Sequence, residues 1–283
     1  MLFLLTALDC EARPVIHHFR LQRNQAFKPF PLYENETLKL AVSGVGMDNM
    51  SLACATLAGI HSATQFNSGN QVSEAAWLNI GIAGHQSATP GSAFLVHKVS
   101  GGSASPDSQG RHFYPVWPGQ WPHLTASLMT VDKPELEYAQ DALYDMEATA
   151  FYRTASRFST LELIHVLKVI SDNPQSSLAD INKESVSRLV GNQIELISMI
   201  VERLLHTADM LTELAQKPKG FDDLLAHYSV SVSQQVQLGR VLRRLQLLEA
   251  GAVLDLLPLA QYKSIKHWMQ AANEYLSTLT IRF

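Results

Sequence analysis

The chain has 283 residues, of which 46% are hydrophobic and 17% are charged, so it can form one large core or a core with a smaller appended unit. A formal net charge of -4 and the lack of a long basic run argue against nucleic acid as a partner. No uncharged apolar run approaches the roughly 18 residues that a membrane-spanning helix needs. The N-terminal apolar stretch has no basic residue before it and soon meets Asp9 and Glu11, so we expect no signal peptide and a cytoplasmic protein without membrane contact.

Short apolar runs recur through the first 170 or so residues, and each ends in Gly, Ser, Asp or Asn. In chain order they are LFLLTAL, LKLAVSGVG, AWLNIGIAG, SAFLVHKV, ASLMTVD and IHVLKVISD. Continuous runs of this kind are typical of strands that are covered on both faces. Helix-like stretches separate several of them, such as MDNMSLACATLAGI after the second run and MEATAFYRTASRF before the last. The pattern predicts a three-layer αβα fold around a mixed, largely parallel sheet.

The character of the chain changes twice outside these runs. Residues 101–123 are rich in Gly, Pro, Ser and aromatic rings, which predicts a long loop. From about residue 180 apolar residues recur at helical spacing, and we predict an α/β domain over 1–205 and an all-helical C-terminal extension over 206–283. Three arginines in 231–249, at positions 240, 243 and 244, indicate a solvated helix face or a partner surface rather than a DNA-reading helix.

Acidic residues follow three of the predicted strands or begin the next helix. Glu11 comes just after the first strand, Glu147 opens a helix, and Asp172 ends the last strand. Taken singly, such residues are usually turn formers or compensate a helix dipole. Because the ends of parallel strands share one edge of a sheet, the three acids can also converge on one cleft. The glycine turns at 43–46 and 81–85 fall on the same edge, where backbone can approach a ligand.

These motifs, in this order, resemble the purine nucleoside phosphorylase and nucleosidase superfamily, whose members cleave the N-ribosidic bond of nucleosides. The matching stretches are ALDCEA, SGVG, NIGIAGHQSATPGSAFLV, YDMEATAF and VISDNP, within about residues 1–205. The resemblance implies the phosphorylase-like fold and a small-molecule nucleoside as substrate. It also implies a homo-oligomer, with a dimer favoured, and neither a metal nor a cofactor beyond inorganic phosphate as a co-substrate.

The resemblance also implies a role for each matching residue. Asp172, supported by Ser171, would donate a proton or hydrogen bond to the departing purine. Glu147 would hold the ribose hydroxyls while Met146 packs against the sugar, and Asp145 would be structural. The backbone at Ala83 and Gly84 would approach the substrate. These implied positions explain why an apolar stretch contains carboxylates, since a buried charge is costly unless something pairs with it.

The same resemblance leaves the attacking group open between phosphate and water. Glu11 matches the acid that activates water in hydrolytic members, whereas Ser43, Gly44, Arg13 and Lys168 are candidates to hold phosphate. The stretches EAR and TVDKP are similar to a phosphorylase subgroup, which favours a glycosyltransferase acting by phosphorolysis. The motif G-D-P-x-R is absent, which favours hydrolysis. The similarity to the subgroup decides the expectation, which is a nucleoside phosphorylase with a hydrolytic nucleosidase as the alternative.

Three further points stay open from the sequence alone. In the glycine turn at 81–85, AGH replaces the common AGG, so His85 is expected to reshape the pocket. The family's base-stacking aromatic has four candidates in the long loop, Phe113, Tyr114, Trp117 and Trp121. A non-catalytic nucleoside-binding or scaffold protein with this fold is the alternative to an enzyme.

Overall fold

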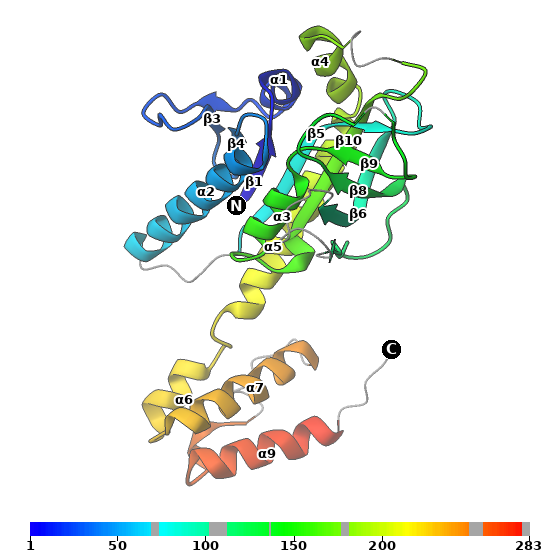
Figure 1. Ribbon diagram of the computed structural model, residues 1–283. Coiled ribbons are helices and arrows are strands. Elements are labelled where there is room, and N and C mark those ends of the chain that lie inside the picture. The colour runs from blue at the N-terminus through cyan, green and yellow to red at the C-terminus, as the bar shows by residue number, and fades with distance from the viewer. Residues whose placement is uncertain (69–73, 102–111, 136, 177–180, 249–256, 279–283) are drawn as a thin grey trace. The chain divides into compact units, whose positions relative to one another are not determined.

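The computed structural model describes residues 1–283 except 69–73, 102–111, 136, 177–180, 249–256 and 279–283 (Figure 1). The chain divides into two compact units, Met1–Thr212 and Glu213–Phe283. The helix α5 (Ile194–Ala215) contains this division as well as the domain boundary after residue 205 that the sequence suggests. That earlier boundary stays a prediction.

The first unit is built on a ten-stranded mixed sheet. Its strands are β1 (Leu2–Thr6), β2 (Gln22–Arg23), β3 (Leu32–Glu34), β4 (Leu38–Val42), β5 (Ala76–His85), β6 (Ala93–Gly101), β7 (His112–Phe113), β8 (Thr125–Thr130), β9 (Leu143–Asp145) and β10 (Ile164–Asp172). The six longer strands coincide with the six predicted apolar runs. The sequence does not predict the strands of two or three residues, because a strand that short is too brief to show a periodic pattern.

Strand β1 lies between β4 and β5 and is parallel to both, and β5 is also parallel to β10. Antiparallel pairs join β10 to β6 and β5 to β9, while β6–β8 and β8–β9 are parallel. These pairings link β5, β10, β6, β8 and β9 into a closed ring that contains both parallel and antiparallel neighbours. The α/β class is therefore confirmed, and its sheet is mixed.

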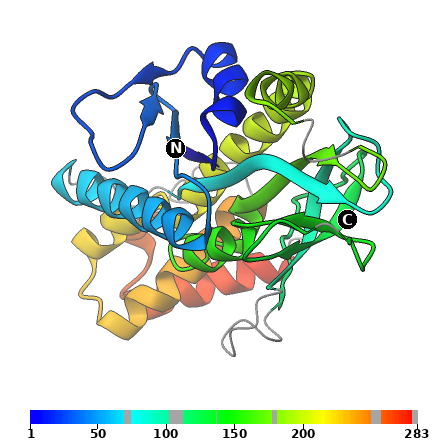
Figure 2. The same ribbon diagram turned by 45° about the horizontal axis from the view of Figure 1, so that its top comes forward.

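Helices cover both faces of the sheet in this unit. On one face α2 (Met47–Ser68) and α3 (Ala148–Ala155) pack against Phe3, Leu5 and Trp77. On the other, α1 (Asp9–His18), α4 (Lys183–Gly191) and α5 pack against Leu2 and Leu4. In Figure 2, α1 and α4 lie above the long strand β5, and α2 and α3 lie below it. Every residue of β1 is buried, which is why its sequence shows no alternation of apolar and polar residues.

The second unit has its own apolar core. Its described helices are α6 (Phe221–His227), α7 (Val232–Leu248), the short 3₁₀ helix η3 (Leu259–Gln261) and α9 (Ile265–Thr278). Leu238, Leu242 and Leu245 of α7 pack with Trp268 and Ala272 of α9. The three arginines of α7 are exposed. Within the described residues, no helix has both the length and the apolar character to cross a membrane.

Candidate active site

A cavity of about 150 Å³ lies where β1, β5 and β10 end and α1 and α3 begin. Seven of the predicted site residues line it: Glu11, Ala83, Gly84, Met146, Glu147, Ser171 and Asp172. They come from separate stretches of sequence, and the parallel pairing of β1, β5 and β10 brings those stretches to one edge.

Glu11 stands in the first turn of α1 and is buried. Its Oε2 accepts hydrogen bonds from the backbone N–H groups of Ala7 and Leu8 at 3.0 and 2.9 Å. Its Oε1 accepts one from Ile82 at 2.9 Å, so the side chain links the end of β1 to the end of β5. Burial raises the pKa of Glu11, while Lys168 and these backbone donors oppose the rise. Both carboxylate oxygens of Glu11 accept hydrogen bonds from backbone N–H groups, and such bonds favour the ionised form of a carboxyl group.

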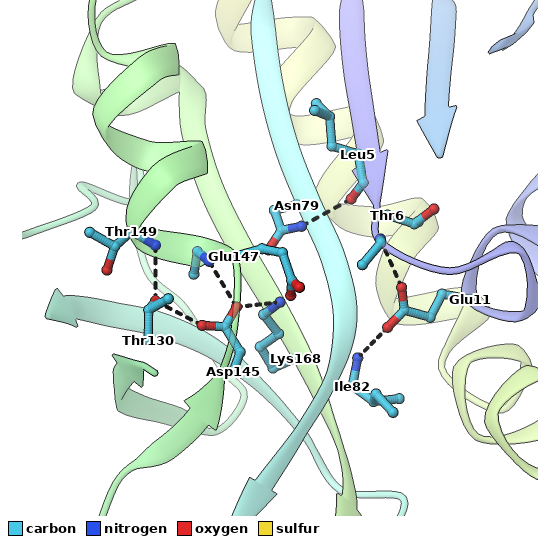
Figure 3. Close-up of polar contacts among 12 residues, drawn as sticks. Leu5, Thr6, Glu11, Asn79, Ile82, Thr130, Asp145, Glu147, Thr149 and Lys168 are labelled. Atoms are coloured by element: carbon cyan, nitrogen blue, oxygen red, sulfur yellow. Dashed lines mark hydrogen bonds and ion pairs between the residues drawn. The ribbon is translucent and has the colours of Figure 1, made fainter. Parts of the chain in front are cut away.

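Lys168 is fully buried on β10, and its ammonium is paired with Asp145 (Figure 3). The Nζ–Oδ2 distance is 2.8 Å. Asp145 is held in turn by the Thr130 hydroxyl at 2.8 Å and the backbone N–H of Ala148 at 2.9 Å. Burial alone lowers the pKa of Lys168, but the carboxylates of Asp145, Glu147 and Glu11 outweigh it and raise that pKa. The acid at 145 is therefore the partner of a buried cation.

Gly81 allows Lys168 and Glu11 to approach each other across β5. A Cβ at this position would lie 3.0 Å from Glu11 Oε1 and 3.1 Å from Lys168 Nζ. Any larger residue would push the two charges apart. Lys168 itself does not line the cavity, so its positive charge lowers the pKa of Glu11 and Glu147 without Lys168 contacting the cavity.

Glu147 precedes the first residue of α3, and its Oε1 accepts a hydrogen bond of 2.7 Å from the Gly46 N–H. Gly46 has a φ of 101°, a left-handed conformation that favours glycine. The glycine turn at 43–46 thus positions Glu147, and the N–H of Gly46 is used in doing so. Burial and then Asp145 raise the pKa of Glu147 to about 7, against the opposing effects of Lys168 and the Gly46 N–H.

The raised pKa of Glu147 predicts a pH-dependent stability. The folded chain holds this proton more tightly than the unfolded chain, so the free energy of unfolding should fall between about pH 5 and pH 8. Glu147→Gln should remove that loss and be more stable than the unchanged chain near pH 8, by on the order of 3 kcal/mol. Urea unfolding across this pH range checks the slope. The exposed Glu184→Gln should leave it unchanged, and an equal slope in Glu147→Gln would contradict the prediction.

Asp172 ends β10 next to a register shift and is buried. The Ser171 hydroxyl donates to its Oδ1 and lies 3.3 Å from the Ala83 carbonyl oxygen. The Tyr138 hydroxyl donates to its Oδ2. Burial raises the pKa of Tyr138 and Asp172 raises it further, so the phenol stays protonated and donates. Both carboxylate oxygens of Asp172 are therefore occupied by hydroxyl groups.

The candidates for holding phosphate do not gather at the cavity. Arg13 is exposed on α1 and does not line the cavity. The Ser43 hydroxyl is within 3.2 Å of the Thr6 carbonyl oxygen and 2.8 Å of that of Gly44. Neither Ser43 nor Gly44 lines the cavity, and Lys168 is paired with Asp145.

The cavity contains aromatic side chains that sequence reasoning missed. Tyr138 and Tyr144 line it, whereas none of the four loop aromatics does. Of those four, Phe113 packs on Tyr152, Trp117 packs on Trp121 and His165, and Tyr114 is exposed. Tyr144 opens the YDMEATAF stretch but was not selected from it. Tyr138 lies in a stretch with no helical or strand period, so no sequence signal marks it.

His85, the departure from AGG, shapes the turn rather than the cavity wall. Its Nδ1 accepts hydrogen bonds from the backbone N–H groups of Ser87 at 3.1 Å and Ala88 at 3.0 Å. Its Nε2 lies 3.3 Å from Asp141 Oδ1. His85 therefore joins the end of β5 to the stretch that contains Tyr138.

Solved structures with this arrangement of elements are nucleosidases. A nucleosidase from Chlamydia trachomatis matches with a TM-score of 0.51 and 20% identity, over 71% of this chain and 98% of that one. The 5′-methylthioadenosine/S-adenosylhomocysteine nucleosidase from S. pneumoniae matches with a TM-score of 0.53 and 15% identity, over 72% and 99%. An S-adenosylhomocysteine nucleosidase from Streptococcus pyogenes matches at 0.50 and 14%, over 72% and 96%.

The chain has the fold of these nucleosidases. At the level of the fold, this confirms the resemblance that the motifs suggested. No family model and no curated protein matches the chain. The nucleosidase fold thus places Glu11, Glu147 and Asp172 around one cavity, although the sequence identities to the solved structures are low.

Proposed function

We propose that the chain is a hydrolytic nucleosidase that cleaves the N-ribosidic bond of a purine nucleoside. The observation that carries this proposal is the convergence of Glu11, Glu147 and Asp172 on one cavity within the nucleosidase fold. Breaking the bond leaves negative charge on the base and positive charge on the sugar. An enzyme gains rate by stabilising both.

Each carboxyl group has a distinct part in this reaction. Asp172, oriented by Ser171, gives a proton or hydrogen bond to the departing base. Glu147, held by the Gly46 N–H, binds the ribose hydroxyls. Glu11 takes a proton from a water molecule as the water oxygen bonds to the anomeric carbon. The products are the free base and the free sugar.

Water is favoured over phosphate by the placement of the basic groups. A phosphate dianion needs several fixed donors, and a guanidinium is the most effective of them. Arg13 is exposed, and the Ser43 hydroxyl lies against carbonyl oxygens. Lys168 does not line the cavity and is paired with Asp145. Activating water needs only a well-placed carboxylate, which Glu11 supplies. Phosphorolysis is the second candidate, because the EAR and TVDKP stretches favour it.

The substrates we favour are adenosine and its 5′-modified derivatives. The C. trachomatis nucleosidase has been solved bound to adenine and to MTA. The cavity of this chain is bounded by apolar groups, among them Val45, Val131 and Met146, that suit an uncharged base and sugar.

The test is to incubate such nucleosides with the protein, with and without phosphate, and to identify the sugar product. We expect free sugar at the same rate in both buffers, and a loss of about 100-fold or more in Glu11→Gln. Asp9→Asn, an exposed carboxylate two residues away on the same helix, should retain activity. Ribose-1-phosphate that forms only with phosphate would establish the phosphorylase instead. Binding without cleavage would indicate a non-catalytic nucleoside-binding protein.

A further inference from the structure

Tyr138 occupies the part of the cavity next to Asp172. Its side chain is only 4% exposed, its hydroxyl donates to Asp172, and its ring lies over the backbone of Gly84. A Cβ at Gly84 would lie 2.6 Å from Tyr138 Cε1 and 2.8 Å from its hydroxyl oxygen. The phenol thus covers the backbone and the carboxylate that a purine base would contact in the proposed reaction.

While Tyr138 stays in this position, a base that bonds to Asp172 must compete with the phenol. One carboxylate oxygen accepts from Ser171 and the other from Tyr138. The cavity of about 150 Å³ that remains is also bounded by the phenol itself. A ligand that bonds to Asp172 must therefore replace the hydroxyl group and displace the ring.

The segment that carries Tyr138, residues 137–142, is largely exposed. Glu137, Ala139, Gln140 and Asp141 are exposed, so Tyr138 and Ala142 are its buried residues. Its polar attachments include His85 to Asp141 and the Gln140 N–H to the Tyr144 hydroxyl at 3.0 Å. Movement of this segment would leave the helix-packed cores on both sheet faces intact.

The backbone of Tyr138 also favours movement. Its φ is 47°, in the left-handed region that tyrosine rarely adopts. Such a conformation persists only when surrounding contacts hold it. Here they include the hydrogen bond to Asp172, the edge contact with Tyr144 (ring centroids 5.7 Å apart) and packing against Met129 and Val131. Once a ligand takes over Asp172, the backbone can relax.

We propose that Tyr138 is a gating residue that competes with the purine base for Asp172 and thereby sets which ligands enter. This inference rests on the proposed function. A ligand displaces the phenol only if it offers both a planar ring to cover Gly84 and Tyr144 and a polar group to bond with Asp172. A purine base meets both requirements, whereas a free sugar offers hydroxyl groups but no planar ring.

Binding of free adenine separates the gate from catalysis. Calorimetry would compare the unchanged chain with Tyr138→Phe, which loses only the competing hydroxyl, and Tyr138→Ala, which also loses the ring. We expect adenine to bind about 3- to 10-fold more tightly to Tyr138→Phe, because the ligand no longer has to displace the hydrogen bond between the phenol and Asp172. Tyr138→Ala should also bind more tightly than the unchanged chain. Tyr152→Phe removes the hydroxyl of another buried tyrosine outside the cavity and should change nothing.

A second measurement tests the closed position without any ligand. Gly84→Ala should lower the midpoint of thermal unfolding in the unchanged chain, because its Cβ meets the Tyr138 ring. The same change should cost much less in a Tyr138→Ala background, and this coupling identifies the contact.

The outcomes distinguish the gate from the proposed function. Equal adenine affinity in all variants, or weaker binding to both Tyr138 variants, would overturn the gate while leaving a nucleosidase possible. Absence of coupling between positions 84 and 138 would overturn it too. If no variant binds adenine or a nucleoside although the coupling is present, the proposed function fails and the gate for a purine base fails with it.

Discussion

Asp172→Asn is expected to lower kcat/KM for nucleoside cleavage by about 100-fold or more while leaving the fold intact. Asparagine has the same size and can still accept a hydrogen bond from the Ser171 hydroxyl. It has no ionisable proton to give to a departing base. The asparagine amide nitrogen cannot accept from Tyr138, but the Tyr138 hydroxyl can accept a hydrogen bond from it, so this isosteric change should disturb the surroundings little.

Release of free base, measured at equal circular dichroism, checks this expectation. Asp9→Asn serves as the matched control, since it makes the same chemical change at an exposed position. A fall in kcat with little change in KM would place Asp172 in the bond-breaking step. Activity retained within a few-fold would remove Asp172 from the mechanism.

Lys168→Met is expected to destabilise the first unit by about 3–5 kcal/mol near pH 8, because it leaves Asp145 buried without its ion partner. Methionine fills a similar volume, so the cost comes mainly from charge. Glu11 and Glu147 would also lose the nearby cation that opposes the rise of their pKa values. No described lysine or arginine lines the cavity, so none there could replace this charge.

The loss should depend on pH in a definite direction. Without Lys168 the folded-state pKa values of the neighbouring carboxyl groups rise further, so the folded chain binds protons more tightly than the unfolded chain. The destabilisation should therefore shrink towards about pH 5 and grow as pH rises.

Urea unfolding followed by tryptophan fluorescence measures this, since Trp77, Trp117 and Trp121 all lie in the first unit. The exposed Lys28→Met is the control. A loss of the same size at both ends of the pH range would show that packing, not charge, explains the effect.

Much of the fold and of the candidate site could be predicted from the sequence, because both depend on short apolar runs and on the residues that end them. Six apolar runs without alternation indicated covered strands, and an acid or glycine at the end of a run indicated the edge where a ligand binds. Glu11, Glu147 and Asp172 were selected in this way, and the structure brings all three to one cavity.

The direction of a side chain on a helix was decided only by packing. Glu11 and Arg13 are two residues apart on α1, and so about 200° apart around its axis. Once the hydrogen bonds from Ala7, Leu8 and Ile82 turn Glu11 inward, Arg13 must face solvent. Motif matching placed both residues at the site, but a helix presents only one of them to it.

Contacts between distant segments were likewise decided by the tertiary structure. The sequence made Lys168 a candidate to hold phosphate, but the packing of β10 and β9 pairs it with Asp145, next to Gly81. Tyr138 carries no sequence signal, because its position over Asp172 depends on the path of residues 137–142 and their attachment to His85 and Tyr144. The sequence by itself thus determined which chemical groups end the strands, and the packing of strands and loops decided which of them meet.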